Sequence, residues 1–358
     1  MGITMTNLEK AHKINRILMR KLHSVCEEYG VTYFYDSGAL IGAVRHHDFI
    51  PWDDDIDVAF TREEYNKLKS IPKEAWGEDF ELVEVKDIVK DSFFDFPTRL
   101  VYLGDSIPLQ SYDKVKGHVQ KKYEDKMVLD CFVLDNAYDS KLKQLILRMR
   151  LTFIYGQCMG HRDSIDYSEF GTITGLGVRF FAAIGRHKSL DKLREKYSRI
   201  SQSVKGNTKH YFYSNYPMPE LKKWVEKDWY RETVPLKVGD DYFNCPVEYD
   251  KVLKECYGDY MQFPPEETRV PMHVKPDEQY NYSIILSNIH IEGIMVSVIN
   301  TLTLYNDRQE YFTKIPAEWR VYENTRKAKR YYRRFYVQHD GTHCYEWSNT
   351  ACIISIFK

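Results

Sequence analysis

Four carboxylates fall within five consecutive positions of the sequence, at Asp53, Asp54, Asp55 and Asp57. Like charges at this spacing raise one another's pKa and destabilise a fold unless a cation offsets them. On a strand alternate residues share one face, so we expect Asp53, Asp55 and Asp57 to converge. Three hard oxygen ligands on one face suit Mg²⁺ or Mn²⁺. The alternative is a solvated acidic loop, the usual state of an acidic run.

Small residues form a turn before the acidic run. Ser37 and Gly38 open the stretch SGALIGAV, and small turn residues let backbone N–H groups approach a phosphate closely. Two carboxylates at i and i+2 after such a turn serve phosphoryl or nucleotidyl transfer, in which a metal ion bridges phosphate oxygens. The sequence therefore predicts a metal site among Asp53, Asp55 and Asp57.

A third carboxylate is expected from a neighbouring strand. Asp130 lies inside the apolar run MVLDCFVL, which is typical of a strand buried on both faces. A buried carboxylate is costly unless it is paired or bound to a metal, so Asp130 is the best candidate. The alternative is a carboxylate bonded to a loop backbone. Asp135 is a weaker candidate, because the residues after it favour a turn.

Three segments carry a resemblance to a known family. The residues 37–60, SGALIGAVRHHDFIPWDDDIDVAF, resemble the signature of the LicD family, which includes the fukutin-related transferases. VLDCFVLD resembles the strand of the third carboxylate in that family. Residues 252–267, VLKECYGDYMQFPPEE, resemble its Tyr-Gly-Asp-Tyr and Pro-Pro stretch. The resemblance covers about residues 21–270.

The resemblance implies a nucleotidyltransferase-like α+β fold, a mixed sheet with flanking helices. It also implies transfer of a phospho-substituent, such as phosphocholine or an alditol phosphate, from a CDP-linked donor to a glycan hydroxyl. By position, Asp55 and Asp57 match the metal pair, Asp130 matches the third carboxylate, and Ser37 and Gly38 match the turn. One departure is Ala39, where many members carry Thr or Ser and so a hydroxyl that could touch a phosphate.

Basic residues near these motifs are candidate phosphate ligands. Arg45 follows the turn, and Arg suits bidentate recognition of phosphate; the alternative is an ion pair with the nearby aspartates. His46 is a weaker candidate, since a structural or surface role is more common. Arg99, in FPTRLVYL, lies where the family often has a basic residue, which suggests phosphate binding.

The resemblance predicts one reaction, and two other functions remain open. The donor pyrophosphate is expected over Ser37 and Gly38, the acceptor hydroxyl attacks the phosphorus distal to cytidine, and CMP leaves. A true nucleotidyltransferase would share the metal site but move NMP and release pyrophosphate. A non-catalytic glycan- or membrane-binding scaffold is the third interpretation. The conjunction of Asp55, Asp57 and Asp130 argues against it, because unneeded like charges cost stability.

Regular elements around these motifs follow from periodicity. Thr6 to Glu9 has the form of a capping box, and apolar residues at helical spacing follow until Gly30. Strands are expected over 31–35, 55–60, 82–89, 98–103 and 127–134, and helices over 141–203. We expect a catalytic domain over 1–275 and an extension over 276–358, strand-leaning over 282–304 and then a basic helix over 319–335. The role of the extension is not indicated.

Composition limits the partners. Lys and Arg total 51 and Asp and Glu total 52, so no charge excess favours nucleic acid, although the basic and aromatic block 326–335 is a local exception. The seven cysteines contain no C-x-x-C pair, which fits reduced thiols in a cytoplasmic protein.

Basic and apolar residues interleave over 141–190. This pattern indicates peripheral contact with the inner face of the cell membrane and a lipid-linked acceptor. The alternative is an ordinary amphipathic helix that covers the sheet.

Overall fold

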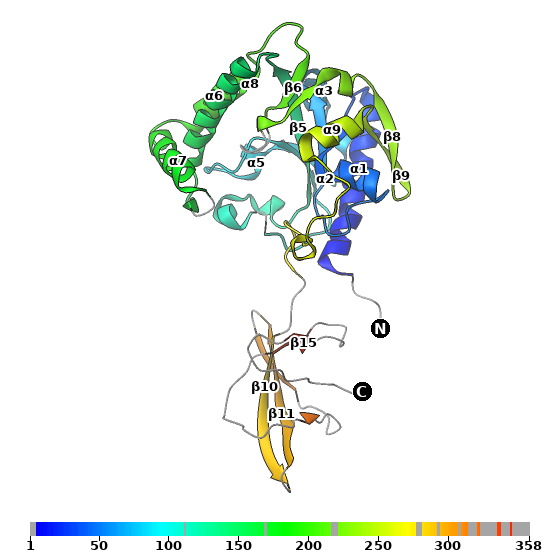
Figure 1. Cartoon of the computed structure of the whole chain (residues 1–358), viewed down its shortest axis with the longest axis vertical. Coiled ribbons are helices and arrows are strands. Elements are labelled where there is room, and N and C mark those ends of the chain that lie inside the picture. Colours follow the sequence, from blue (N-terminus) through cyan, green and yellow to red (C-terminus); the bar gives the residue numbers. More distant parts are fainter. Residues whose placement is uncertain are drawn as a thin grey trace. The chain divides into compact units, whose positions relative to one another are not determined.

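The computed structural model describes residues 5–110, 112–167, 170–215 and 221–276. Beyond residue 276 it describes only the strand segments given below, without their side chains. The chain divides into two compact units, Met1–Lys275 and Pro276–Lys358 (Figure 1).

The first unit is built on a mixed sheet. Its strands run in the order β1-β2-β5-β4-β3, and β6 pairs with β5 and β7 with β6. The β2–β5 pair is parallel, and the other pairs of this sheet are antiparallel. The bounds are β1 Phe34–Tyr35, β2 Asp57–Thr61, β3 Phe80–Glu84, β4 Thr98–Tyr102, β5 Val128–Ala137, β6 His210–Tyr213 and β7 Trp224–Glu226, with a separate hairpin of β8 Thr233–Val238 and β9 Asp241–Pro246.

Helices flank this sheet. Figure 1 shows α6, α7 and α8 on one side of the central strand β5, and α1, α2 and the β8–β9 hairpin on the other. The mixed sheet and its flanking helices confirm the predicted α+β class. The bounds are α1 Asn7–Tyr29, α2 Ser37–Arg45, α3 Arg62–Ser70, α4 Lys73–Trp76, α5 Val85–Ile88, α6 Lys141–Met159, α7 Thr172–Gly185, α8 Leu190–Ser201 and α9 Tyr249–Tyr257.

Helix α1 begins and ends at the predicted signals. Thr6 accepts a hydrogen bond from the backbone N–H of Glu9, and the Glu9 carboxylate accepts from the backbone N–H of Thr6, which completes the capping box. Gly30 closes the helix in the left-handed conformation at φ 64°. The buried apolar residues of α1 share one core with Val58, Phe60 and Cys131 of the sheet.

The sheet has two chemically different faces. Alternate strand residues point to opposite faces. Val58 of β2 and Cys131 of β5 lie in the core with α1, so Asp57 and Asp130, one position earlier, project from the other face. Farther along the same face, Ala59 and Phe132 pack into a second core with Val252 of α9, so the carboxylates lie beside apolar packing on that face.

Two predicted strands differ from the structure. The strand expected over 55–60 begins at Asp57, because the residues before it bond to other segments. The strand expected over 82–89 ends at Glu84 and continues as the short helix α5. Its partner β4 begins at Thr98, directly after Pro97, which has no N–H to extend the ladder.

The second unit contains a six-stranded sheet. Its strands are β10 Asn281–Ile291, β11 Ile294–Asn306, β12 Gln309–Thr313, β13 Val321–Tyr322, β14 Phe335–Val337 and β15 Cys344–Tyr345. The long β10–β11 pair confirms the strand preference predicted over 282–304. Within the basic helix expected over 319–335, the described residues 321, 322 and 335 are strand, and the remainder lies outside the described residues.

We predict opposite stability effects for two Gly→Ala substitutions. At Gly30 the left-handed φ of 64° penalises a Cβ, so Gly30→Ala should lower the free energy of unfolding by about 1 kcal/mol. At Gly177, inside α7, an added Cβ meets no atom within 4 Å, so Gly177→Ala should raise it by up to about 1 kcal/mol. Urea unfolding followed by circular dichroism measures both, and equal signs would contradict the prediction.

Candidate active site

A row of charged residues crosses four neighbouring strands. Asp57 of β2 is directly opposite Asp130 of β5, and Asp130 is directly opposite Arg99 of β4. Asp36, which follows β1, donates its backbone N–H to the carbonyl of Asp57 at 3.1 Å. Residues directly opposite one another share a face of the sheet. The pairing of β2 with β5 thus brings together two predicted carboxylates that are far apart in sequence.

Arg99 offsets the charge of Asp130. Its Nε donates to Asp130 Oδ1 at 2.5 Å and its Nη2 to Oδ2 at 3.2 Å, a bidentate pair. Its Nη1 donates to the hydroxyl of Tyr112 at 2.6 Å. Burial lowers the pKa of Arg99, but the charge of Asp130 outweighs it and the pKa is raised. Arg99 is therefore a fixed cation beside the carboxylates.

Asp54 does not join the row. Its carboxylate is fully buried and accepts the backbone N–H groups of Met272 at 3.2 Å, His273 at 2.8 Å and Val274 at 2.6 Å. These bonds fasten the segment 272–274 to the acidic run. They also place His273 Nε2 3.0 Å from Oδ2 of Asp55. The strand begins only at Asp57, but the side chains of Asp53 and Asp55 hydrogen-bond one another and the charges of both act on Asp57, so these three carboxylates lie close together.

The carboxylates differ in their pKa values. Burial raises the pKa of Asp57 well above its ordinary value, and the charges of Asp55 and Asp130 raise it further. Burial and the charge of Asp55 raise the pKa of Asp53 to about 8. For Asp55 burial acts in the same direction, but the hydrogen bond from His273 outweighs it and the pKa is lowered. Ionisation is therefore most costly at Asp57 and Asp53, where burial and neighbouring carboxylates favour the protonated form.

His273 is the cation that relieves Asp55. Burial lowers the pKa of its imidazole, but the hydrogen bond and charge of Asp55 outweigh burial and raise that pKa to about 9. Nothing in the local sequence around residue 273 indicated this, because the histidine lies more than two hundred residues from the acidic run.

A cavity of about 360 Å³ opens beside this cluster. Small-molecule sites typically span roughly 300–1,000 Å³, so the cavity is large enough for part of a nucleotide-linked substrate. Both positively and negatively charged side chains line the cavity. This lining suits an anionic substrate that binds together with a metal cation. The charged and aromatic lining residues are Asp54, Asp55, Asp95, Asp130, Arg99, Lys126, Arg162, His273, Phe94 and Tyr112.

The residues present fit a divalent cation, and Asp55 belongs to two candidate ligand sets. The sequence predicts Asp55, Asp57 and Asp130. In the part of the chain that the structure describes, Asp54, Asp55 and His273 are the group whose ligand atoms lie within 4.8 Å of one another. Asp55 accepts a hydrogen bond from His273 and Asp130 pairs with Arg99, and the charges of Asp55 and Asp130 both act on Asp57. The crowded, buried carboxylate of Asp57 is the feature that a cation would relieve.

The predicted turn lies against the acidic run. A Cβ added at Gly38 would come within 2.6 Å of Asp53 Oδ2, so a side chain at this position would displace that carboxylate. Ser37 begins α2 in the left-handed region at φ 54°, where a residue other than Gly is strained. Ala39 is buried in the core with α1, where a methyl group packs without needing a partner.

Arg45 and His46 lie in an aromatic cluster. Arg45 donates to the carbonyls of Tyr260 at 2.9 Å and Gln262 at 3.4 Å, and its guanidinium lies 4.6 Å from the Phe263 ring centroid. Among the described residues it forms no salt bridge, so the alternative interpretation of Arg45, an ion pair with the aspartates, is not supported. The His46 ring contacts Phe263 edge-on at 5.5 Å. Burial lowers the pKa of both Arg45 and His46.

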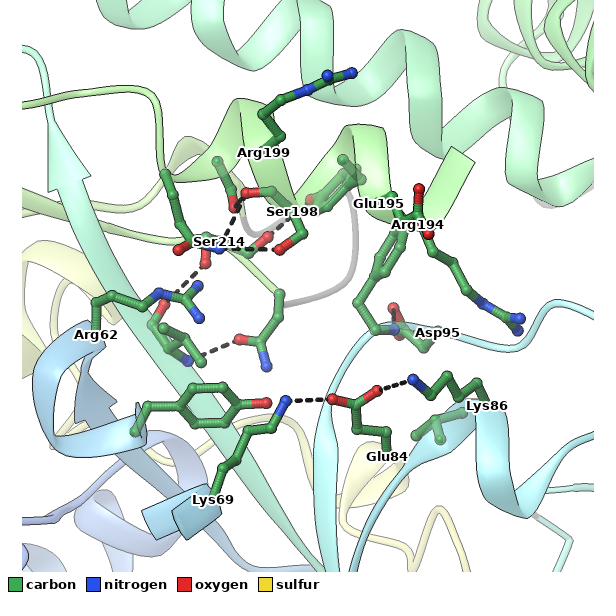
Figure 2. A pocket seen from close by; sticks show the side chains of 18 of the residues that line it. Arg62, Lys69, Glu84, Lys86, Asp95, Arg194, Glu195, Ser198, Arg199 and Ser214 are labelled. Atoms are coloured by element: carbon green, nitrogen blue, oxygen red, sulfur yellow. Dashed lines mark hydrogen bonds and ion pairs between the residues drawn. The ribbon is translucent and has the colours of Figure 1, made fainter. Parts of the chain in front are cut away.

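A larger pocket of about 970 Å³ lies between α3, α8 and the end of β3 (Figure 2). Figure 2 shows Glu84 between Lys69 and Lys86, and these three side chains form ion pairs. Val133 lines this pocket and points to the face of β5 opposite Asp130, since the two residues are an odd number of positions apart. Asp95 lines both cavities. Asp130 and Arg99 of the row line the smaller cavity and not the larger one.

We predict that Asp57→Asn stabilises the protein freed of divalent cations. The folded pKa of Asp57 lies above its ordinary value of 3.8, so ionising it costs stability, and the cost grows as pH rises from that value toward the folded pKa. Asp57→Asn should therefore raise the Tm in EDTA more at pH 8 than at pH 5. Added Mg²⁺ should raise the Tm of the wild type more than that of the variant. Asp79→Asn, at an exposed site, is the control; equal effects of the two variants would refute the prediction.

We further predict that removing the cation beside Asp130 is costly. Arg99→Met leaves a partly buried carboxylate without its partner, which typically lowers the free energy of unfolding by about 3–5 kcal/mol. Arg99→Lys should recover part of this loss, because it keeps the charge but not the bidentate geometry. Arg231→Met, which breaks exposed ion pairs, should cost less than about 1 kcal/mol. Urea titration measures all three, and a similar cost for Arg99→Met and Arg231→Met would contradict the assignment.

Comparison with known proteins places this site in a family. Residues 30–126, which contain the turn, the acidic run and Arg99, match the family described as LicD/FKTN/FKRP, nucleotidyltransferase domain. The lipopolysaccharide cholinephosphotransferase LicD of Haemophilus influenzae is 24% identical over 284 residues, which cover 71% of this chain and 91% of that protein.

Shorter matches extend to other organisms. The ribitol 5-phosphate transferase FKRP of mouse is 38% identical over 52 residues, 14% of this chain and 10% of that protein. An uncharacterized protein of Rickettsia typhi, RT0683, is 28% identical over 115 residues, 26% of this chain and 37% of that protein. Residues 30–126 of this chain thus resemble the LicD/FKTN/FKRP nucleotidyltransferase domain, and the chain is similar to a cholinephosphotransferase over most of that relative's length.

Proposed function

We propose that this chain is a metal-dependent transferase that moves a phospho-substituent from a CDP-linked donor to a hydroxyl of a cell-surface glycan and releases CMP. The relatives named above are a cholinephosphotransferase and a ribitol 5-phosphate transferase, so the proposed class is an enzyme that transfers a substituted phosphate group. Phosphocholine and an alditol phosphate are the two groups that we propose the enzyme transfers.

The observation that carries the proposal is the carboxylate row beside the cavity of about 360 Å³. Two aspartates from parallel strands lie side by side with a fixed arginine. Positioning and electrostatic stabilisation are what phosphoryl transfer asks of a protein, because the bonds that change belong to the substrates. No nucleophilic side chain is needed.

We assign Asp55, Asp57 and Asp130 as the carboxylates that hold Mg²⁺ or Mn²⁺. When bound, the ion supplies charge neutralisation for the phosphate oxygens. Arg99 fixes the orientation of Asp130 through its bidentate pair, and His273 does the same for Asp55 through its hydrogen bond. Both partners hold the carboxylates in a fixed orientation.

Donor phosphate is proposed to bind at the turn and the aromatic cluster. Ser37 and Gly38 begin α2, whose N-terminus carries positive partial charge. Arg45 and Arg269 lie over the same Phe263 ring at 4.6 and 5.3 Å, so two guanidinium groups converge there. Arg45 is a stronger candidate for phosphate contact than Arg99, since its guanidinium has no carboxylate partner among the described residues, whereas Arg99 pairs with Asp130.

The reaction forms one bond and breaks one. The acceptor oxygen attacks the phosphorus distal to cytidine, the bond from that phosphorus to the bridging oxygen breaks, and CMP leaves. The proton of the hydroxyl passes to one of the carboxylates of the row. We propose that the acceptor is lipid-linked and that the protein works in the cytoplasm at the inner face of the cell membrane.

CMP release tests the proposal directly. The full chain is incubated with Mg²⁺, lipid-linked glycan extract and CDP-choline, CDP-glycerol or CDP-ribitol in turn. We expect acceptor-dependent CMP with one donor, and at least a roughly 100-fold loss of rate in Asp55→Asn. Asp79→Asn, matched in chemistry but exposed and remote from the cavity, should keep the wild-type rate.

Other outcomes separate the alternatives. Release of pyrophosphate instead of CMP would identify a nucleotidyltransferase. If no donor yields CMP or pyrophosphate, and the Tm responds neither to Mg²⁺ nor to nucleotide, the transferase proposal is refuted and a non-catalytic scaffold is favoured.

A further inference from the structure

Helix α6 is apolar on two opposite sides. Its inner side, which includes Leu147, Leu151 and Ile154, packs into a core with α8 and β6. Leu142, Leu145, Ile146 and Met149 are nevertheless exposed, each by 47–68% of its surface. An ordinary amphipathic helix that covers a sheet has polar residues on its outer side. The sequence left this alternative open, and the exposed side of α6 argues against it.

The exposed residues form one stripe. Positions i, i+3, i+4 and i+7 recur on one face of a helix, so Leu142, Leu145, Ile146 and Met149 fall within an arc of about 100°. At about 100° per residue, Leu147 and Leu151 are centred on the opposite side. The stripe is thus a separate apolar surface and not the margin of the core.

Helix α7 adds to the exposed apolar surface. It packs closely on α6 through glycines, since a Cβ added at Gly185 would overlap the carbonyl of Gln157 and one at Gly156 would come within 2.9 Å of Phe181. Leu176 and Phe180 of α7 are each 62% exposed. We call the six residues Leu142, Leu145, Ile146, Met149, Leu176 and Phe180 the outer apolar residues.

The charge on these two helices has one sign. No Asp or Glu occurs between Ser140 and Arg162 or between Gly171 and Lys188. Lys141 and Arg148 fall on one side of the α6 stripe, and Lys143 and Arg150 fall on the other, each about a quarter turn away. Arg and Lys in these positions can extend along an apolar surface and place their charge at its edge.

From this arrangement we propose that the outer apolar residues dock on an anionic lipid bilayer, with the flanking cations at the level of the headgroups. An apolar stripe bordered by cations is the pattern of a helix that lies in a membrane interface. In the part of the chain that the structure describes, no helix is long and apolar enough to cross a bilayer. The contact is therefore peripheral.

The charge also argues against a second copy of the chain as the occupant. A symmetric contact would place the cations of one copy against the same cations of the other, and like charges in contact are unfavourable. An anionic headgroup layer complements them. The lipid contact rests on the proposed function in one respect: it would bring the cavity to a lipid-linked acceptor. The contact itself requires neither the donor nor a metal ion.

Vesicle sedimentation tests the contact with the full chain. One set of vesicles is phosphatidylcholine alone. The other set contains phosphatidylcholine with about 30 mol % phosphatidylglycerol, so that about one lipid in three is anionic. We expect binding to the anionic vesicles, weakened by salt. The double substitution Leu145→Glu and Met149→Glu should reduce the bound fraction at least about tenfold. Tyr29→Glu with Tyr242→Glu, two exposed residues elsewhere on the same unit, is the control of equal charge change.

A second pair of variants tests the cations. Lys143→Gln with Arg150→Gln should weaken binding to the anionic vesicles several-fold, whereas Lys13→Gln with Lys237→Gln should leave it unchanged. All altered side chains are exposed, and an unchanged Tm verifies the fold. Asp55→Asn should bind vesicles like the wild type, so failure of the transferase proposal and failure of the lipid proposal are distinguishable.

Three results would overturn the inference. The first is a wild type that does not bind anionic vesicles. The second is a Leu145→Glu and Met149→Glu variant that binds as well as the wild type. The third is a wild type that is dimeric in light scattering and does not bind vesicles, together with a Leu145→Glu and Met149→Glu variant that is monomeric. That result would make the stripe a contact between two copies of the chain.

Discussion

Repulsion among buried carboxylates is the constraint on which this site depends. Asp57 and Asp130 face one another across the parallel β2–β5 pair, and Asp36 lies at the next strand. Such a row is stable only where positive charge is built in around it. Arg99 supplies that charge to Asp130 through a bidentate pair, and His273 supplies it to Asp55. Among the residues that the structure describes, no cation is paired with Asp57, and burial together with the charges of Asp55 and Asp130 raises its pKa.

The rest of the first unit holds these charges in place. The helix α1 fills the opposite face of the sheet, so the strands that carry the row are backed by a core. Asp54 uses its carboxylate on backbone N–H groups of residues 272–274, and this brings a histidine from the end of the unit to the acidic run. The acidic run therefore contains one aspartate, Asp54, that holds backbone segments together, next to aspartates that are candidate metal ligands. Their roles differ because their hydrogen-bond partners differ.

The smaller cavity is lined by both cations and carboxylates, an arrangement that suits transfer of a substituted phosphate group. The cavity lies on the carboxylate face, whereas the larger pocket lies on the other face and its charges are largely paired with one another. The exposed stripe on α6 gives the unit a second surface whose chemistry fits lipid. Catalytic chemistry and the proposed membrane contact are thus carried by different elements.

The sequence by itself determined the local features of this protein. Capping at Thr6 and Gly30 set the bounds of α1, the apolar run around Asp130 identified the central strand, and the turn and acidic run identified the family. These signals are local, because each depends on residues a few positions apart. Tertiary structure alone decided which charges meet. The pairs Asp130–Arg99 and Asp55–His273 join segments 31 and 218 positions apart, and no periodicity encodes such distances. It also decided which apolar face of α6 is buried, since both faces have the same residue types and only packing against α8 distinguishes them.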